Sequence, residues 1–131
     1  MKYTIFETFF AALLLFWPCG PALADNAIRV VVYGDSLVSG YQLQPEEAFA
    51  AQLDHKFKES GFFNAEVKDM SAAGETSAEG LQRLPALLAQ RPDIVVVAFG
   101  TNDAMRGISV DRIYQYVASI AQQLSAIHAY V

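Results

Sequence analysis

The stretch "IRVVVYGDSLVSG", residues 28–40, decides how the rest of this sequence is interpreted. Its apolar run shows no alternation of polar and apolar residues, which is typical of a strand covered on both faces of a sheet. The run ends at Gly34, Asp35 and Ser36, three residue types that commonly form turns or cap helices. A small hydroxyl residue on a glycine turn directly after a buried strand is also well placed to act as a nucleophile. The other loops decide between these two interpretations.

Strand and helix signals alternate three times along the chain, without an internal repeat or a linker that would indicate a second domain. Strands are predicted over residues 28–33, 65–70 and 93–99, and helices over about 45–60, 76–90 and from about 109 onward. This alternation predicts an α/β fold with a parallel sheet. The more polar 65–70 strand is expected at an outer position.

Local signals place the ends of the helices. Pro45 suits the first turn of the first helix, and Gly61 suits the position just past its end. The spacing from Thr76 to Glu79 matches a capping box at the start of the second helix. Pro85 is expected to kink that helix or to restart it, because proline lacks the N–H that an interior helical position donates.

The sheet is expected to continue beyond the three strands. The strand at 93–99 is the most apolar of the three and would have neighbours on both edges, yet the sequence stops at Val131, one helix later. A right-handed crossover would deliver the next strand at that point. We expect the chain to be the N-terminal portion of a longer protein. The alternative is that another molecule covers the open edge, since an exposed apolar strand edge promotes association.

The first 24 residues have the pattern of a secretory signal peptide. Lys2 precedes the apolar stretch "IFETFFAALLLFW", and small residues follow, so we expect cleavage after Ala24 and an exported, periplasmic or secreted, domain over residues 25–131. A lipid anchor on Cys19 is the alternative, although Trp17-Pro18 lacks the small residues that lipoprotein processing prefers. The remainder holds no cysteine, so a disulfide is excluded, and no membrane span is expected after the leader is removed.

Composition narrows the classes of partner. The net charge of −5 is mildly acidic and unclustered. A nucleic-acid-binding protein would be expected to show a basic stripe instead. The sequence therefore favours a small-molecule partner.

Three glycine-containing loops follow the three strands. They are "YGDSLVSG" at residues 33–40, "SAAGETSAEG" at 71–80 and "FGTNDAMRG" at 99–107. In an open parallel sheet, functional loops lie at the carboxyl ends of the strands. A strand order of 2-1-3 would bring all three together above the first strand, whereas an order of 3-2-1 would separate the first loop from the third.

In the 2-1-3 order these loops supply the parts of an acyl-transfer site. Ser36 offers a hydroxyl nucleophile, and three donors could bind a developing oxyanion: the backbone N–H of Ser36, the backbone N–H of Gly74 and the side-chain amide of Asn102. Taken singly, each block has a simpler explanation. Gly34-Asp35-Ser36 could be only a turn, and in "GTND" either Asn102 or Asp103 could cap a helix. Their joint occurrence, each just past a strand, favours the functional interpretation.

The three blocks resemble those of the GDSL or SGNH hydrolases. The first block is "GDSLVSGYQL" from Gly34, the second centres on the glycine of "SAAGETSAEGLQRLPALL", and the third is "GTND" from Gly100. The resemblance covers nearly all of residues 28–125 and is strongest to the exported bacterial hydrolases that act as thioesterase, arylesterase and lysophospholipase. It implies a three-layer α/β/α sandwich with a flavodoxin-like 2-1-3-4-5 sheet, of which strands 4 and 5 would be absent here.

The resemblance also implies site roles. Ser36 would be the nucleophile, with Gly74 and Asn102 joining it in the oxyanion hole, and the reaction would proceed through an acyl-serine without a metal or organic cofactor. The family's last block, D-x-x-H, supplies the general base and its orienting acid, and the sequence contains no such block. His128 has Ser125 three positions before it, and His55 is expected to face solvent. We therefore expect the chain alone to be nearly inactive.

Residues beside the loops indicate the substrate only weakly. Asp35, Leu37, Met105 and Ile108 are predicted to bind substrate, and the apolar ones, together with Leu43, would favour an acyl chain. The alternative for the apolar residues is core packing, and the Asp35 carboxylate is expected to accept N–H groups of its own turn.

Two other functions remain open. A carbohydrate O-acetyl esterase of the same family would use the same loops. A non-catalytic module could bind an anion or nucleotide instead, although no glycine-rich phosphate-binding motif is present and Arg106 is the only basic residue in the three loops.

Overall fold

The computed structural model describes residues 27–131; the predicted leader, residues 1–24, lies outside the described residues. The elements follow the predicted alternation: β1 (Ile28–Gly34), η1 (Pro45–Glu47), α1 (Phe49–Glu59), β2 (Ala65–Asp69), α2 (Ser77–Leu88), β3 (Ile94–Ala98), α3 (Thr101–Met105) and α4 (Val110–Ala126). None of the helices within this range is both long enough and apolar enough to cross a bilayer.

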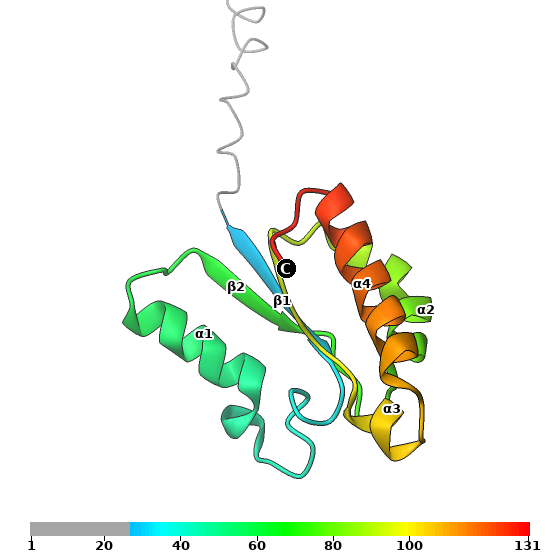
Figure 1. The fold of residues 1–131 in the computed structure, drawn as a ribbon. Helices are drawn as coiled ribbons and strands as arrows, with labels where there is room; N and C mark the ends of the chain where they lie inside the picture. Colours follow the sequence, from blue (N-terminus) through cyan, green and yellow to red (C-terminus); the bar gives the residue numbers. More distant parts are fainter. Residues whose placement is uncertain (1–26) are drawn as a thin grey trace, which may run out of the picture.

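The three strands form one parallel sheet in the order β2-β1-β3, which confirms the predicted 2-1-3 order. Val32 pairs with Asp69 on one side and with Val96 on the other, so β1 lies in the middle. The polar strand β2 lies at an edge, as expected. Helix α1 covers one face of the sheet, and α2 and α4 cover the other, so the chain forms three layers (Figure 1).

Each face of β1 contributes to a different core. Val31 and Tyr33 pack among buried residues of α2 and α4, which are Leu84, Leu87, Ile120 and Leu124. Val32 packs on the opposite face with Val38 and Ala50. Because alternate residues of a strand point to opposite faces, the unbroken apolar run of β1 fills both layers.

The edge of β3 that faces away from β1 contacts Tyr130, near the last residue of the chain. Tyr130 forms a single parallel bridge with Ile94: the Tyr130 N–H donates to the Asp93 carbonyl at 2.9 Å, and the Val95 N–H donates to the Tyr130 carbonyl at 2.8 Å. This contact lies where the expected right-handed crossover would deliver the next strand.

Two helix boundaries differ from those predicted. The predicted 45–60 helix is interrupted at Ala48, whose extended backbone separates the short helix η1 from α1. The Thr76 capping box is present as predicted, but α2 ends at Leu88 and continues through Pro85 as one helix. Proline removes one interior hydrogen bond there, and the bonds on either side keep the helix continuous.

Candidate active site

Ser36 follows a tight turn at the carboxyl end of β1. A Cβ on Gly34 would lie 2.3 Å from the Ala98 carbonyl oxygen, so glycine is required for β1 and β3 to approach so closely at this point. The carboxylate of Asp35 accepts the Leu37 N–H at 3.0 Å, and the Asp35 carbonyl accepts the Ser39 N–H at 3.1 Å. The turn therefore holds Ser36, which is half-buried, at the start of the loop.

The three predicted loops meet at one pocket of about 320 Å³. Its lining consists of Ser36, Tyr41, Ala73, Gly74 and Asn102, so each of the three loops contributes to it. The convergence follows from the sheet order, because β1 lies between the strands that precede the other two loops. Tyr41 was not predicted, although its position five residues after Ser36 in the same loop is a signal that could have found it.

Two backbone donors at this pocket lack a partner among the residues that the structure describes. Within residues 27–131, neither the Ser36 N–H nor the Gly74 N–H donates a hydrogen bond to a protein group. Gly74 has φ +81°, a left-handed conformation that favours glycine, and an added Cβ would meet nothing within 4 Å. The backbone conformation, and not a lack of space, is therefore the reason for glycine at this position.

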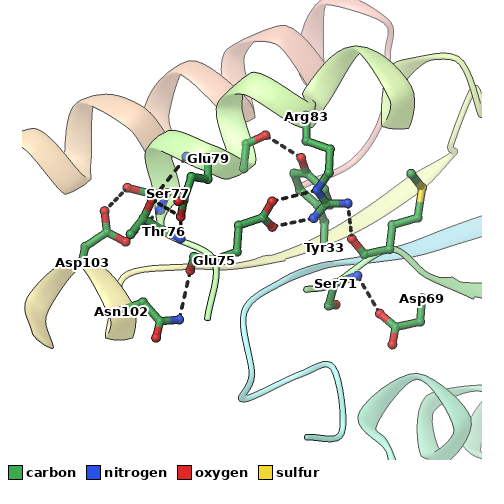
Figure 2. Close-up of polar contacts among 12 residues, drawn as sticks. Tyr33, Asp69, Ser71, Glu75, Thr76, Ser77, Glu79, Arg83, Asn102 and Asp103 are labelled. Atoms are coloured by element: carbon green, nitrogen blue, oxygen red, sulfur yellow. Dashed lines mark hydrogen bonds and ion pairs between the residues drawn. The ribbon is translucent and has the colours of Figure 1, made fainter. Parts of the chain in front are cut away.

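Asn102 lies on α3, a short helix that the sequence reasoning treated as a loop. Its Nδ2 group donates to the Glu75 carbonyl at 3.0 Å, which fixes the direction of the amide (Figure 2). A side-chain amide has two N–H bonds. One hydrogen of Nδ2 therefore remains available beside Gly74.

Asp103 joins the third loop to the second. Its side chain is buried, and its two oxygens accept the Ser77 N–H at 2.8 Å and the Ser77 hydroxyl at 2.6 Å (Figure 2). Because the Ser77 N–H belongs to the first turn of α2, Asp103 caps a helix from a distant part of the chain. Asp103 of "GTND" therefore caps a helix, as one interpretation of this block proposed, and that helix is α2.

A charged network supports the second loop. Arg83 binds Glu75 through two nitrogens, and the Tyr33 ring lies beneath its guanidinium group. Burial raises the pKa of Tyr33 to about 12, and its hydroxyl donates to the Gly80 carbonyl at 2.5 Å. This network was not predicted from the sequence; an arginine at position 83, within the mostly apolar stretch "LQRLPALL" that packs on the core, is the signal that could have indicated it.

None of the four predicted substrate-binding residues lines the Ser36 pocket. Asp35 is buried, whereas Leu37 is 72% exposed and Met105 is 81% exposed. Ile108 lines a neighbouring pocket of about 420 Å³ together with Arg106. Core packing does not account for Leu37 or Met105 in this structure, and their role in binding substrate stays a prediction.

The two histidines lie away from this pocket. His55 is exposed on α1 and pairs with Glu59 at 3.7 Å. His128 follows the end of α4 and lines a pocket with Arg29 and Asp93, at the amino ends of β1 and β3. Ser36 lies at the opposite, carboxyl end of the sheet. Residues 27–131 also hold no cluster of three side chains suited to binding a metal ion.

Comparison with known proteins identifies the family. The profile of the GDSL-like Lipase/Acylhydrolase family matches residues 32–131, which is most of the chain and includes all three loops. The chain belongs to the GDSL family of lipases and acylhydrolases. The family resemblance of the three sequence blocks is therefore confirmed.

Relatives within the GDSL family agree with this assignment. The chain is 38% identical to Esterase TesA of Pseudomonas aeruginosa over 101 residues, covering 76% of this chain and 50% of the relative. It is 37% identical over 107 residues to Thioesterase 1/protease 1/lysophospholipase L1 of Escherichia coli, covering 81% of this chain and 50% of the relative. A crystal structure of TesA superposes with a TM-score of 0.73 at 37% identity, covering 77% of this chain and 56% of the other.

The chain spans about half the length of the curated GDSL relatives that it matches. The shared fold thus includes the three-strand sheet and its flanking helices. The matched region also includes every residue that lines the Ser36 pocket.

Proposed function

We propose that this chain carries the nucleophile and the oxyanion hole of a serine hydrolase acting on acyl esters or thioesters. The observation that supports the proposal best is the set of donors around one pocket: the unpartnered N–H groups of Ser36 and Gly74 and the remaining hydrogen of the Asn102 amide. Donors fixed before the reaction stabilise charge that develops on a carbonyl oxygen. The names of the relatives, which include an esterase and a thioesterase, agree with this substrate class.

The proposed reaction follows from these groups. The Ser36 hydroxyl attacks the substrate carbonyl carbon as a base removes its proton, and the three donors bind the oxygen of the tetrahedral intermediate. The carbon–oxygen or carbon–sulfur bond to the leaving group then breaks, which leaves an acyl-serine and a protonated alcohol or thiol. Water attacks the acyl-serine, and the acid is released with the Ser36 hydroxyl restored.

We infer that residues 27–131 do not supply the base. The sequence contains no D-x-x-H, and both histidines lie away from Ser36. Removing the base of a serine triad lowers turnover by about 10⁶-fold, and oxyanion donors and binding retain only about 10³- to 10⁴-fold over water. The chain alone is therefore expected to be nearly inactive.

A chimera tests the proposal directly. It consists of the full chain followed by the part of Esterase TesA that lies beyond the matched 101 residues. We expect it to hydrolyse a short-chain aryl ester and to be phosphonylated at Ser36 by a serine-reactive phosphonate. Ser36→Ala should abolish both, and the full chain alone should be nearly inactive. Labelling that persists at another residue would reject Ser36 as the nucleophile. Equal rates for the chain and the chimera would reject the inference that the chain alone lacks the base.

The competing functions give different results in the same assay. A carbohydrate O-acetyl esterase would prefer acetylated sugars over aryl esters or thioesters with longer acyl chains. A non-catalytic binding module would show no Ser36-dependent turnover at all. Comparing acyl-chain lengths with acetylated sugars, each with the Ser36→Ala variant as the control, separates the three.

We also propose that residues 1–24 direct export of the chain. The support is the leader pattern, with its single basic residue, apolar stretch and small residues before Asp25. Expression in a bacterial host should give a periplasmic protein whose N-terminus is Asp25. A protein that keeps Met1 in the cytoplasm would contradict export, and incorporation of labelled palmitate that depends on Cys19 would favour the lipid anchor.

A further inference from the structure

We propose that Arg83 is a positioning residue for the oxyanion hole, acting through Glu75 on the loop of residues 70–76, which we call the oxyanion loop. The inference rests on the proposed function, because it concerns the placement of the Gly74 N–H and the Asn102 amide. Arg83 lies on α2 and is not among the residues that line the Ser36 pocket.

All three guanidinium nitrogens of Arg83 are engaged. Nε donates to Glu75 Oε1 at 2.8 Å, Nη2 donates to Glu75 Oε2 at 2.5 Å, and Nη1 donates to the Met70 carbonyl at 2.7 Å (Figure 2). The pair with the carboxylate is bidentate, a geometry that arginine provides and lysine does not. One side chain therefore ties Met70 at the start of the oxyanion loop to Glu75 near its end.

The two ends held by Arg83 lie on either side of Gly74 and help to place it. The Met70 N–H donates to the Val32 carbonyl at 2.8 Å, which attaches the start of the oxyanion loop to β1. At the other end, Thr76 caps α2. Nothing packs within 4 Å of the position that a Cβ on Gly74 would occupy. Little packing holds Gly74 from that side, so its position depends on the hydrogen bonds of the loop. Besides those made by Arg83, the Ala72 N–H donates to the Gly34 carbonyl at 2.9 Å, and the Arg106 guanidinium donates to the Gly74 carbonyl at 3.0 Å.

Glu75 connects the Arg83 hydrogen bonds, which we call the Arg83 clamp, to the Asn102 amide. Its carboxylate binds Arg83, while its backbone carbonyl accepts the Asn102 Nδ2 hydrogen at 3.0 Å. A shift of Glu75 would therefore move the Gly74 N–H and change the direction of the Asn102 amide together. Both effects weaken binding of the same oxyanion.

The surroundings of Arg83 make this clamp stiffer than the other arginine contact with the oxyanion loop. The Arg83 guanidinium lies 4.7 Å from the centre of the Tyr33 ring, and Tyr33 is buried and bonded to α2 through Gly80. The Arg83 side chain is 33% exposed and the Glu75 side chain is 10% exposed. Arg106 also reaches this loop, at the Gly74 carbonyl, but its side chain is 53% exposed. Solvent screens an exposed contact much more strongly than a buried one.

Kinetics of the chimera defined above test the inference. Arg83→Met should lower kcat by about 10²-fold, as expected when a reacting group is misplaced by about 1 Å, with KM changed less than threefold. Arg83→Lys should recover only part of the loss, because it restores the charge without the fork. Arg29→Met is the matched control, since Arg29 binds Asp93 at the other end of the sheet and should leave kcat unchanged. All rates are expressed per phosphonate-titrated Ser36, so that unfolded protein does not count.

Nuclear magnetic resonance of the full chain gives a second readout that does not need turnover. Arg83→Met should shift the Gly74 amide and the Asn102 side-chain amide signals, and Glu75→Gln should shift the same signals by a smaller amount. Arg29→Met should move neither.

The outcomes separate this inference from the proposed function. Turnover that does not depend on Ser36 would reject the proposed function. Turnover that depends on Ser36 but keeps its kcat in Arg83→Met would reject the positioning role alone, as would unchanged Gly74 and Asn102 signals. A variant with a lower melting temperature but a parental kcat per titrated Ser36 would assign Arg83 to stability only.

Discussion

The two hydrogen bonds between Ser77 and Asp103 should be among the most important polar contacts for stability, because they join, through buried groups, two of the three loops that line the Ser36 pocket. Asp103 is 1% exposed and Ser77 is 0% exposed. The carboxylate accepts two hydrogen bonds from Ser77, one from its N–H at 2.8 Å and one from its hydroxyl at 2.6 Å. Asp103→Ala would remove both acceptors and leave two buried donors without a partner.

The expected magnitudes follow from these contacts. A hydrogen bond to a charged group contributes about 1.5–3 kcal/mol, and the carboxylate regains some hydration when the protein unfolds. We therefore expect Asp103→Ala to lower the free energy of unfolding by about 3 kcal/mol. Asp103→Asn keeps one acceptor oxygen for the Ser77 N–H and should cost about 1–2 kcal/mol. Ser77→Ala loses only the hydroxyl bond and should cost about 1.5 kcal/mol.

A double-mutant cycle measures whether the two residues act together. Adding Ser77→Ala to Asp103→Ala should cost almost nothing more, which gives a coupling free energy of about 1.5 kcal/mol. The assay is urea denaturation of the full chain followed by circular dichroism, with the exposed Asp111→Ala as the control for removing a carboxylate. A loss below about 1 kcal/mol in Asp103→Ala, or a coupling below about 0.5 kcal/mol, would refute the reasoning.

Three further predictions concern pH, packing and catalysis. Because burial raises the pKa of Tyr33 to about 12, the folded chain keeps this proton to a higher pH than the unfolded chain, whose tyrosines titrate near 10. The contribution of this pKa shift to the free energy of unfolding is complete below pH 10 and is lost as the pH rises to 12, by at most ~3 kcal/mol. Urea midpoints measured over this pH range should show the decline, and Tyr33→Phe should not show it. Gly34→Ala should prevent folding, because its Cβ would lie 2.3 Å from the Ala98 carbonyl oxygen, whereas Gly61→Ala, with open space and φ +86°, should cost only about 1–2 kcal/mol in the same urea assay. In the chimera, Asn102→Ala should lower kcat by about 10²- to 10³-fold with a smaller change in KM, and an unchanged kcat would remove Asn102 from the oxyanion hole.

The alternation of strands and helices could be predicted because it depends on signals that act over short stretches, whereas the 2-1-3 sheet order came from the family resemblance. The apolar run before Gly34 indicated a strand buried on both faces, and the polar 65–70 strand indicated an edge. The capping box at Thr76 was equally local. Because each of the three loops follows a strand of a parallel sheet, Ser36, Gly74 and Asn102 could be placed at the same end of the sheet from the sequence.

The parts that could not be predicted depend on pairs of residues that the fold brings together. Asp103 and Ser77 are 26 positions apart, and Arg83 meets Glu75 only because the oxyanion loop turns back onto α2. Propensity and periodicity say nothing about such pairs. The break at Ala48 was missed for a related reason: Pro45 and the acidic residues after it favour a helical start, and only the path of the chain interrupts it.

The loop residues that the sequence predicted and the residue pairs that only the fold brings together have complementary physical roles. A backbone N–H that is to bind a transient oxyanion must have no competing acceptor in the protein, and within residues 27–131 the N–H groups of Ser36 and Gly74 have none. A group without a partner is not held in direction by its own hydrogen bond, so its neighbours must fix it. Around Gly74 these neighbours include Arg83 and Glu75, which bind each other, and Arg106, which binds the Gly74 carbonyl; none of these contacts occupies the Gly74 N–H. In the proposed oxyanion hole the ion pair of Arg83 and Glu75 supplies such a restraint, so loosening the pair should weaken catalysis even though neither side chain lines the Ser36 pocket.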